Sequence, residues 1–165
     1  MSDALPLIVV AVAATAAAAI DVRTRRIPNA LNLGVALVGL GIAAMGWGRV
    51  GVAMSLAGCA VGLGLMLPGY VLGATGGGDV KLLAALGTLL GPMATIRGFI
   101  AMAIAGGVIA LVVALRRGRL TATLVGTALV ASGASRIDEI GDPHHENRFA
   151  YGPAIAIGAI VAALT

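Results

Sequence analysis

The chain has 165 residues, of which 59% are hydrophobic and only 11% are charged, and its mean hydropathy is +1.04. An ordinary soluble domain carries about 25% charged residues. The apolar residues form long runs that short charged clusters separate along the whole chain. This composition excludes a water-soluble globule, a disordered chain and a disulfide scaffold, and it predicts an integral membrane protein.

The cysteine content and the charge narrow the function classes further. The single cysteine, Cys59, can form neither an intrachain disulfide nor a structural zinc site. The net charge of +4 comes mostly from arginine, and aromatic residues make up 3%, which argues against nucleic-acid binding. Each membrane crossing uses about 20 residues, so the length predicts one membrane-embedded domain over 1–165 with no separate soluble domain.

The apolar runs predict an all-α, polytopic transmembrane bundle. The first run, Leu5–Ile20, is followed by arginines, which is the reverse polarity of a secretory signal peptide. The positive-inside rule therefore places the N-terminus outside and the Asp21–Asn29 loop in the cytoplasm. The other predicted spans are Ala30–Trp47, Val50–Leu72, Val80–Ile96, Gly98–Leu115 and Tyr151–Leu164. These make six spans, or seven if the short apolar segment 121–132 also crosses.

Two acids border predicted spans on the same face of the membrane. Asp21 ends the first span, and Asp79 follows three glycines, Gly76, Gly77 and Gly78, at the start of the fourth. An acid at membrane depth is costly unless it is paired or lines a wet cavity, so both are functional candidates. Taken singly, Asp21 can simply offset nearby arginines and Asp79 can simply cap a helix.

Together, the two acids predict a catalytic pair. Two neighbouring carboxylates do not both ionise easily and share a proton. One can then activate water while the other donates a proton, which hydrolyses a peptide bond without a metal or a nucleophilic side chain. The helix dipole favours Asp79 as the base and Asp21 as the protonated partner, although the pair titrates jointly.

Two extended motifs carry a family resemblance. The segment 21–29, DVRTRRIPN, resembles the first signature of the type IV prepilin peptidases, and 76–87, GGGDVKLLAALG, resembles their second. The latter contains the GxGD motif of intramembrane aspartyl proteases. The tripeptide 151–153, YGP, resembles the element that begins the last span in that family, although Ala150 stands where proline is expected.

The resemblance implies a membrane endopeptidase that removes the short basic leader from prepilin or pseudopilin precursors at the cytoplasmic face of a bacterial or archaeal membrane. It implies Asp21 and Asp79 as catalytic acids and no metal or other cofactor. The active-site loop residues that it implies are Pro28, Asn29, Gly76, Gly77, Gly78, Lys81, Tyr151, Gly152 and Pro153. The chain lacks the cysteine-tetrad insertion of longer members, so it resembles the short peptidase of tight-adherence (Flp) pili or the archaeal preflagellin peptidases, and this implies no N-methyltransferase activity.

Two weaker patterns lie in the polar stretch 135–148. His144, His145 and Glu146 lack further ligands in the sequence and favour a solvated loop over a metal site. The acids of this stretch, Asp138, Glu139, Asp142 and Glu146, are most simply a polar loop at the membrane surface, with attraction of a basic leader as the alternative.

Two other function classes remain open at this stage. A small transporter could use Asp21 and Asp79 to carry protons, and a non-enzymatic membrane subunit could hold both acids for structural reasons. The transporter accounts neither for the glycines and the lysine around Asp79 nor for Ile27, Pro28 and Asn29 after Asp21. The sequence does not determine the oligomeric state or the particular precursor.

Overall fold

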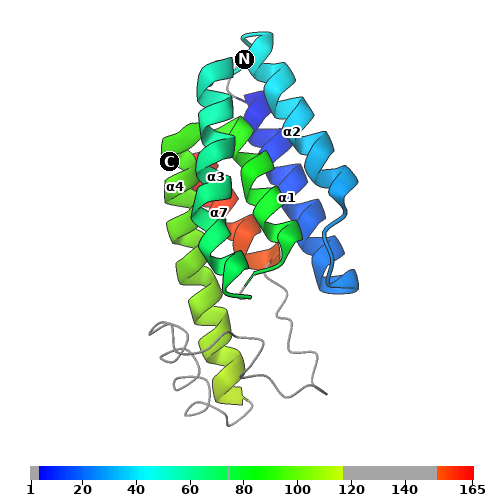
Figure 1. The fold of residues 1–165 in the computed structure, drawn as a ribbon, viewed down its shortest axis with the longest axis vertical. Helices are drawn as coiled ribbons and strands as arrows, with labels where there is room; N and C mark the ends of the chain where they lie inside the picture. The colour runs from blue at the N-terminus through cyan, green and yellow to red at the C-terminus, as the bar shows by residue number, and fades with distance from the viewer. Residues whose placement is uncertain (1–3, 74, 117–151) are drawn as a thin grey trace.

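The computed structural model describes residues 4–73, 75–116 and 152–165. These residues form five helices and no strand: α1 (Ala4–Thr24), α2 (Asn29–Ala44), α3 (Val52–Val71), α4 (Gly77–Arg116) and α7 (Gly152–Leu164) (Figure 1). Helices α1 and α3 and the segment Gly77–Val113 of α4 are long and apolar enough to cross a membrane, whereas α2 and α7 are shorter apolar helices. The described part therefore confirms an all-α membrane protein.

Helix α4 is broken in its middle. Gly91 has φ 74° and ψ 173°, and Pro92 follows it. Figure 1 shows the chain reversing direction there, so that 77–90 and 92–116 lie alongside each other with opposite orientation. Glycine tolerates positive φ, and proline has no N–H to continue a helical ladder. The sequence analysis expected two spans with a turn at Arg97; the reversal occurs earlier, and Arg97 lies within the second helical segment.

The first segment of α4 is the centre of the bundle. Helix α4 packs most extensively against α3 and α7, and α1 packs mainly against α7. Every residue from 82 to 89 is buried, and Leu82, Leu83 and Leu86 are almost completely enclosed. This central position fixes the start of α4, which carries Asp79, against its neighbours.

Glycines let α3 and α4 approach closely. A Cβ atom at Gly58 would lie 2.9 Å from the carbonyl carbon of Gly87, and one at Gly62 would lie 2.8 Å from the carbonyl oxygen of Leu83. Real Cβ atoms do not come so near to backbone. The small-residue pattern that these two glycines form in the sequence thus corresponds to a helix interface.

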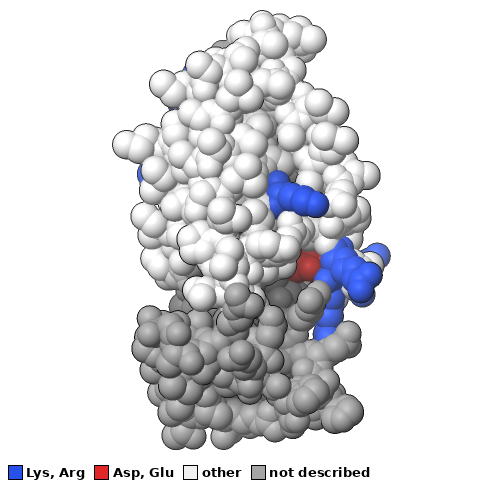
Figure 2. Space-filling view, viewed as in Figure 1, with Lys and Arg blue, Asp and Glu red and all other residues white. Residues whose placement is uncertain are grey.

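The outer surface of the described part is largely apolar. Large side chains such as Ile8, Leu33, Met54 and Ile104 are more than half exposed. Figure 2 shows few charges on the visible face, where basic side chains gather beside an acidic one at the lower end of the described part. Such a surface suits contact with lipid rather than water.

Some element boundaries differ from those expected. Helix α2 begins at Asn29 with Pro28 as its cap and ends at Ala44, whereas the predicted span was Ala30–Trp47. Pro153 lies in the first turn of α7, which begins the last apolar segment as the YGP resemblance implies. Tyr151, Ala150, the segment 121–132 and the polar stretch 135–148 lie outside the described residues.

Candidate active site

Asp21 is a buried acid near the end of α1. Its side chain is 6% exposed, and its Oδ2 accepts a hydrogen bond of 2.8 Å from the N–H of Gly152, the first residue of α7. A Cβ atom at Gly152 would lie 2.7 Å from Cβ of Asp21. Only glycine lets the start of α7 come close enough for this bond.

Asp79 lies in the first turn of α4 and is partly buried. Its Oδ2 accepts a hydrogen bond of 3.1 Å from the N–H of Gly76, and its own N–H donates to the carbonyl of Gly76 at 3.0 Å. The side chain therefore reaches back to the residue before the helix and caps the helix that carries it.

The two carboxylates lie on different helices at the same end of the bundle. The charge of Asp21 contributes to the electrostatic environment of Asp79. Each has one oxygen oriented by the N–H of a glycine. The structure thus places both sequence-predicted acids at the same end of the bundle. At each of them, a glycine N–H donates a hydrogen bond to Oδ2.

Both acids also face a helix N-terminus. Asp79 belongs to the first turn of α4, and Asp21 contacts the first residue of α7. The partial positive charge at a helix N-terminus favours a nearby carboxylate. The sequence argument considered only the helix that carries each acid; with α7 in place, the dipole favours neither as the base.

The connection between α1 and α2 covers the glycine loop. Arg25 has φ 51°, in the left-handed region, and its N–H donates to the carbonyl of Asp21 at 2.7 Å, which ends α1. The chain then places buried Ile27 against Gly78, where a Cβ atom would lie 3.2 Å from that of Ile27. The segment after Asp21 therefore packs on the residue before Asp79.

Two side-chain hydrogen bonds fasten the start of α2 to the start of α4. Lys81 Nζ donates to Oδ1 of Asn29 at 2.9 Å, and Nδ2 of Asn32 donates to the carbonyl oxygen of Gly78 at 3.1 Å. The predicted site residues Pro28, Asn29 and Lys81 thus lie at the same end of the bundle as the acids. The bond between Asn29 and Lys81 joins α2 to α4, and the carbonyl of Pro28 accepts from the N–H groups of Leu31 and Asn32 within α2.

The sequence analysis missed Ile27 and Asn32 as site residues. Asn32 is 4% exposed, and its Oδ1 has no hydrogen-bond partner among the described atoms. The signal that could have revealed it is an amide within an apolar helix, one turn after the first motif. A further missed contact is Tyr70 of α3, whose ring lies 3.4 Å from the position that a Cβ atom of Gly77 would take.

The described residues contain no group of three or more His, Cys, Asp or Glu side chains that could hold a metal. His144, His145 and Glu146 lie outside them. What the described site offers chemically is a pair of carboxylates, which can exchange protons with a bound water and with a substrate.

One of the comparisons with known proteins identifies the class of enzyme. No curated protein and no solved structure matches the chain. The model of the type IV leader peptidase family matches residues 8–111, a range that contains both aspartates and both extended motifs. The chain therefore belongs to the type IV leader peptidase family and is a peptidase.

Proposed function

We propose that the protein is a membrane aspartic endopeptidase of the GxGD type, with Asp21 and Asp79 as its catalytic pair. The observation that carries this proposal is the placement of two acids, from α1 and α4, at the same end of an apolar bundle, each oriented by a glycine N–H. The family adds that the reaction is peptide hydrolysis.

The reaction follows from the hydrogen bonds of the pair. Because Oδ2 of each aspartate accepts from a glycine, we assign the other oxygen, Oδ1, of each to the reaction. One carboxylate takes a proton from water, whose oxygen attacks the carbonyl carbon of the scissile bond. The other carboxyl donates a proton, the C–N bond breaks, and the leaving nitrogen departs as an amine.

The substrate class that fits is a prepilin-like or pseudopilin precursor, whose short basic leader precedes an apolar helix. An apolar substrate helix can lie in the membrane beside the bundle with its leader at the site. The basic residues that follow Asp21, namely Arg23, Arg25 and Arg26, carry the same charge as a basic leader and so do not attract it. Attraction of the leader by the acids of 135–148 stays a prediction.

The proposal also includes a membrane topology and a domain organisation. Counting both segments of α4, the described helices run alternately, which supports six crossings with the N-terminus outside and the site at the cytoplasmic face of a bacterial or archaeal membrane. Residues 1–165 then form a single peptidase domain without an N-methyltransferase part, metal or other cofactor. A role in tight-adherence pili is part of this proposal.

The test is cleavage of a candidate prepilin by the purified protein in detergent or vesicles. Asp21→Asn and Asp79→Asn should each lower the rate by about 10²–10⁴-fold, because each removes one proton-transfer group, while the helical content stays that of the wild type. Asp3→Asn is the matched control and should keep full activity.

Full cleavage by either Asn variant would contradict the catalytic pair. A protein that cleaves no precursor but carries protons across vesicles, in a manner that both Asn variants stop, would instead be a transporter.

A further inference from the structure

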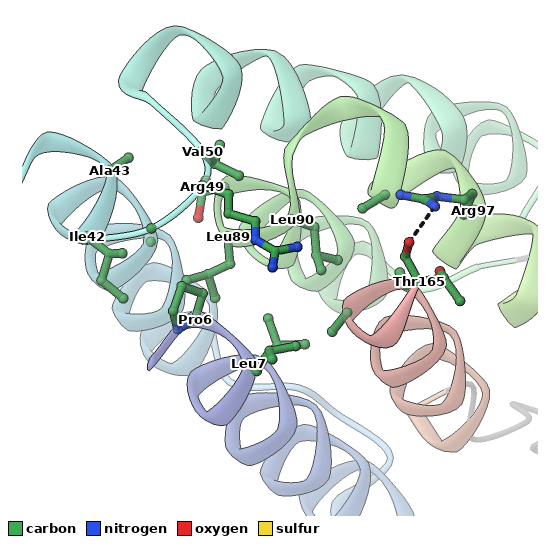
Figure 3. Close-up of a pocket in the computed structure, with 17 residues that line it drawn as sticks. Pro6, Leu7, Ile42, Ala43, Arg49, Val50, Leu89, Leu90, Arg97 and Thr165 are labelled. Atoms are coloured by element: carbon green, nitrogen blue, oxygen red, sulfur yellow. Dashed lines mark hydrogen bonds between the residues drawn. The ribbon is translucent and has the colours of Figure 1, made fainter. Parts of the chain in front are cut away.

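Two hollows in the described part of the chain lie at different places in the bundle. One is a cavity of about 210 Å³ at the end opposite the two aspartates, with Arg49 and Arg97 in its wall. Figure 3 shows Arg97 donating to the main-chain oxygen of Thr165 beside this cavity. The other is a groove on the outer face of α3, toward the end of the bundle that carries Asp79. Only the groove lies at the end where the proposed cleavage takes place.

The groove on α3 is apolar and open. It has a volume of about 430 Å³ and is lined by one face of the helix and the residue that follows it: Gly64, Leu67, Pro68, Val71 and Leu72. All five residues are exposed, and the side chains of Leu67 and Val71 are more than half exposed. A Cβ atom at Gly64 would meet nothing within 4 Å. A second helix can therefore approach the backbone of α3 closely at this glycine.

Pro68 adds a polar feature to this apolar surface. Because proline has no N–H, the carbonyl of Gly64 lacks the donor that the next turn of a helix normally supplies. Within a membrane such a carbonyl is costly beside lipid tails, whereas a neighbouring helix can satisfy it. The α3 groove thus favours a helix over lipid as its occupant.

The end of the α3 groove is continuous with the loop that precedes Asp79. The N–H of Thr75 donates to the carbonyl of Gly69 at 3.2 Å, so the loop folds back onto the last turn of α3. The ring of Tyr70 lies 3.4 Å from the position that a Cβ atom of Gly77 would take. Figure 1 shows this connection from α3 to α4 at the lower end of the bundle. A helix that lies in the groove therefore ends beside the glycine loop.

We propose that the α3 groove binds the apolar helix of the precursor and so brings the peptide bond before that helix to the glycine loop. This inference rests on the proposed function, which supplies a substrate whose cut lies next to an apolar helix. From Gly64 to Leu72 the groove extends about 12 Å, which accommodates about two turns of a helix. The apolar side chains of those turns lie against Leu67 and Val71, as in other complexes of a helix in a groove.

A kinetic test compares two substrates of the purified protein in detergent. One is a prepilin-like precursor, and the other is a short peptide with the same cut that ends before the apolar helix. Gly64→Val fills the groove and should raise the KM of the precursor by about tenfold, as expected for the loss of apolar contacts in a pocket. Its kcat for the precursor and its kcat/KM for the short peptide should stay those of the wild type.

The chain offers two matched controls for this variant. Gly34→Val on α2 and Gly107→Val on the second segment of α4 add the same side chain at exposed glycines that also have nothing within 4 Å. Both should leave the KM of the precursor unchanged, because they alter other outward faces of the bundle.

A cross-linking test detects the complex itself and needs no cleavage. The photoreactive residue p-benzoylphenylalanine replaces Leu67 in the Asp79→Asn variant, and on illumination it should cross-link the precursor. The same residue in place of Leu37 of α2 or Ile104 of α4, each more than half exposed like Leu67, should cross-link the precursor much less.

A wild-type KM in folded Gly64→Val, an equal rise in either control variant, or an equal loss with the short peptide would overturn the inference. Cross-links from position 67 only to a second copy of the chain or only to lipid would overturn it as well. If Gly64→Val does not fold, the cross-links decide the question. If the wild type cleaves neither substrate, the proposed function fails, and the cross-links still show whether the groove binds the precursor.

Discussion

Two glycine amides hold the two carboxylates of the site. Gly152 donates to Asp21 and Gly76 donates to Asp79, and in each case the hydrogen bond reaches Oδ2. At Gly152 the close approach leaves no space for a Cβ atom, since it would lie 2.9 Å from the accepting oxygen itself. The orientation of the acids therefore depends on residues that have no side chain.

Gly152→Ala should lower cleavage strongly because the new methyl group pushes α7 away from Asp21 and breaks the 2.8 Å hydrogen bond. We expect a loss of at least about tenfold in kcat, equivalent to one charge-assisted hydrogen bond. Gly34→Ala is the matched control, because its Cβ atom would meet nothing within 4 Å. Wild-type kcat in Gly152→Ala would show that this contact is dispensable.

Asn32 positions the peptide that precedes Asp79. Its side-chain amide donates to the Gly78 carbonyl in a part-buried hydrogen bond, and Asn32 itself is buried. Asn32→Ala should lower kcat by about tenfold with little change in KM, because the loop loses its anchor and a carbonyl loses its partner.

The control for Asn32→Ala is Ser55→Ala, which removes a buried hydroxyl that has no partner among the described atoms. Its kcat should match the wild type. A change in KM alone for Asn32→Ala would indicate a substrate contact instead of a positioning role.

At the scale of the elements, the most extensive helix–helix interface of the described part is that between α3 and α4, and glycines bring α3 close to the first segment of α4. Gly58 and Gly87 face each other backbone to backbone, and Gly62 contacts Leu83 and Ala84. Without a strong hydrophobic force between helices in lipid, such close packing supplies much of the association. This interface fixes the first segment of α4, which carries Asp79 in its first turn.

Gly58→Val should lower the Tm of the protein markedly, because three added carbons must fit where even a Cβ atom lies within 2.9 Å of the backbone of Gly87. The expected cost is about 1–3 kcal/mol or more, as for overpacking in a core. Thermal unfolding in detergent measures it. Gly64→Val, on the same helix with nothing within 4 Å, should change Tm little, and equal losses in the two variants would rule out a packing cause.

On the scale of the whole molecule, the two ends of the bundle differ in character. One end carries Asp21, Asp79 and most of the described basic residues, and the other carries Arg49, Arg97 and a cavity. The reversal at Gly91 produces this polarity, because it returns the second segment of α4 to the end where Asp79 lies. In the topology proposed above, which follows the positive-inside rule, the end with the aspartates is the cytoplasmic one.

This orientation is tested by labelling single cysteines in a Cys59→Ser background with a membrane-impermeant maleimide. Met45→Cys, exposed between α2 and α3, should react in intact cells, whereas Leu72→Cys, after α3, should react only in opened membranes. The reverse pattern would invert the proposed topology and place the aspartates outside.

Much of the site was predictable because its chemistry is local in the sequence. The glycines before Asp79 and the charged residues after Asp21 mark these acids within a strongly apolar chain, and the apolar runs predict the helices. The reversal within 77–116 was misplaced, because Arg97 offered a charge signal whereas Gly91 and Pro92 act through backbone geometry.

By itself, the sequence determined that this is a helical membrane protein in which two acids border apolar spans. Hydropathy and the scarcity of charge can be counted along the chain without knowing which residues are in contact. Only the tertiary structure decided what surrounds those acids. It brought the N-terminus of α7 to Asp21 and Asn32 to Gly78, and it placed Arg49 and Arg97 around one cavity. These are contacts between residues far apart in the chain, and close helix packing creates them.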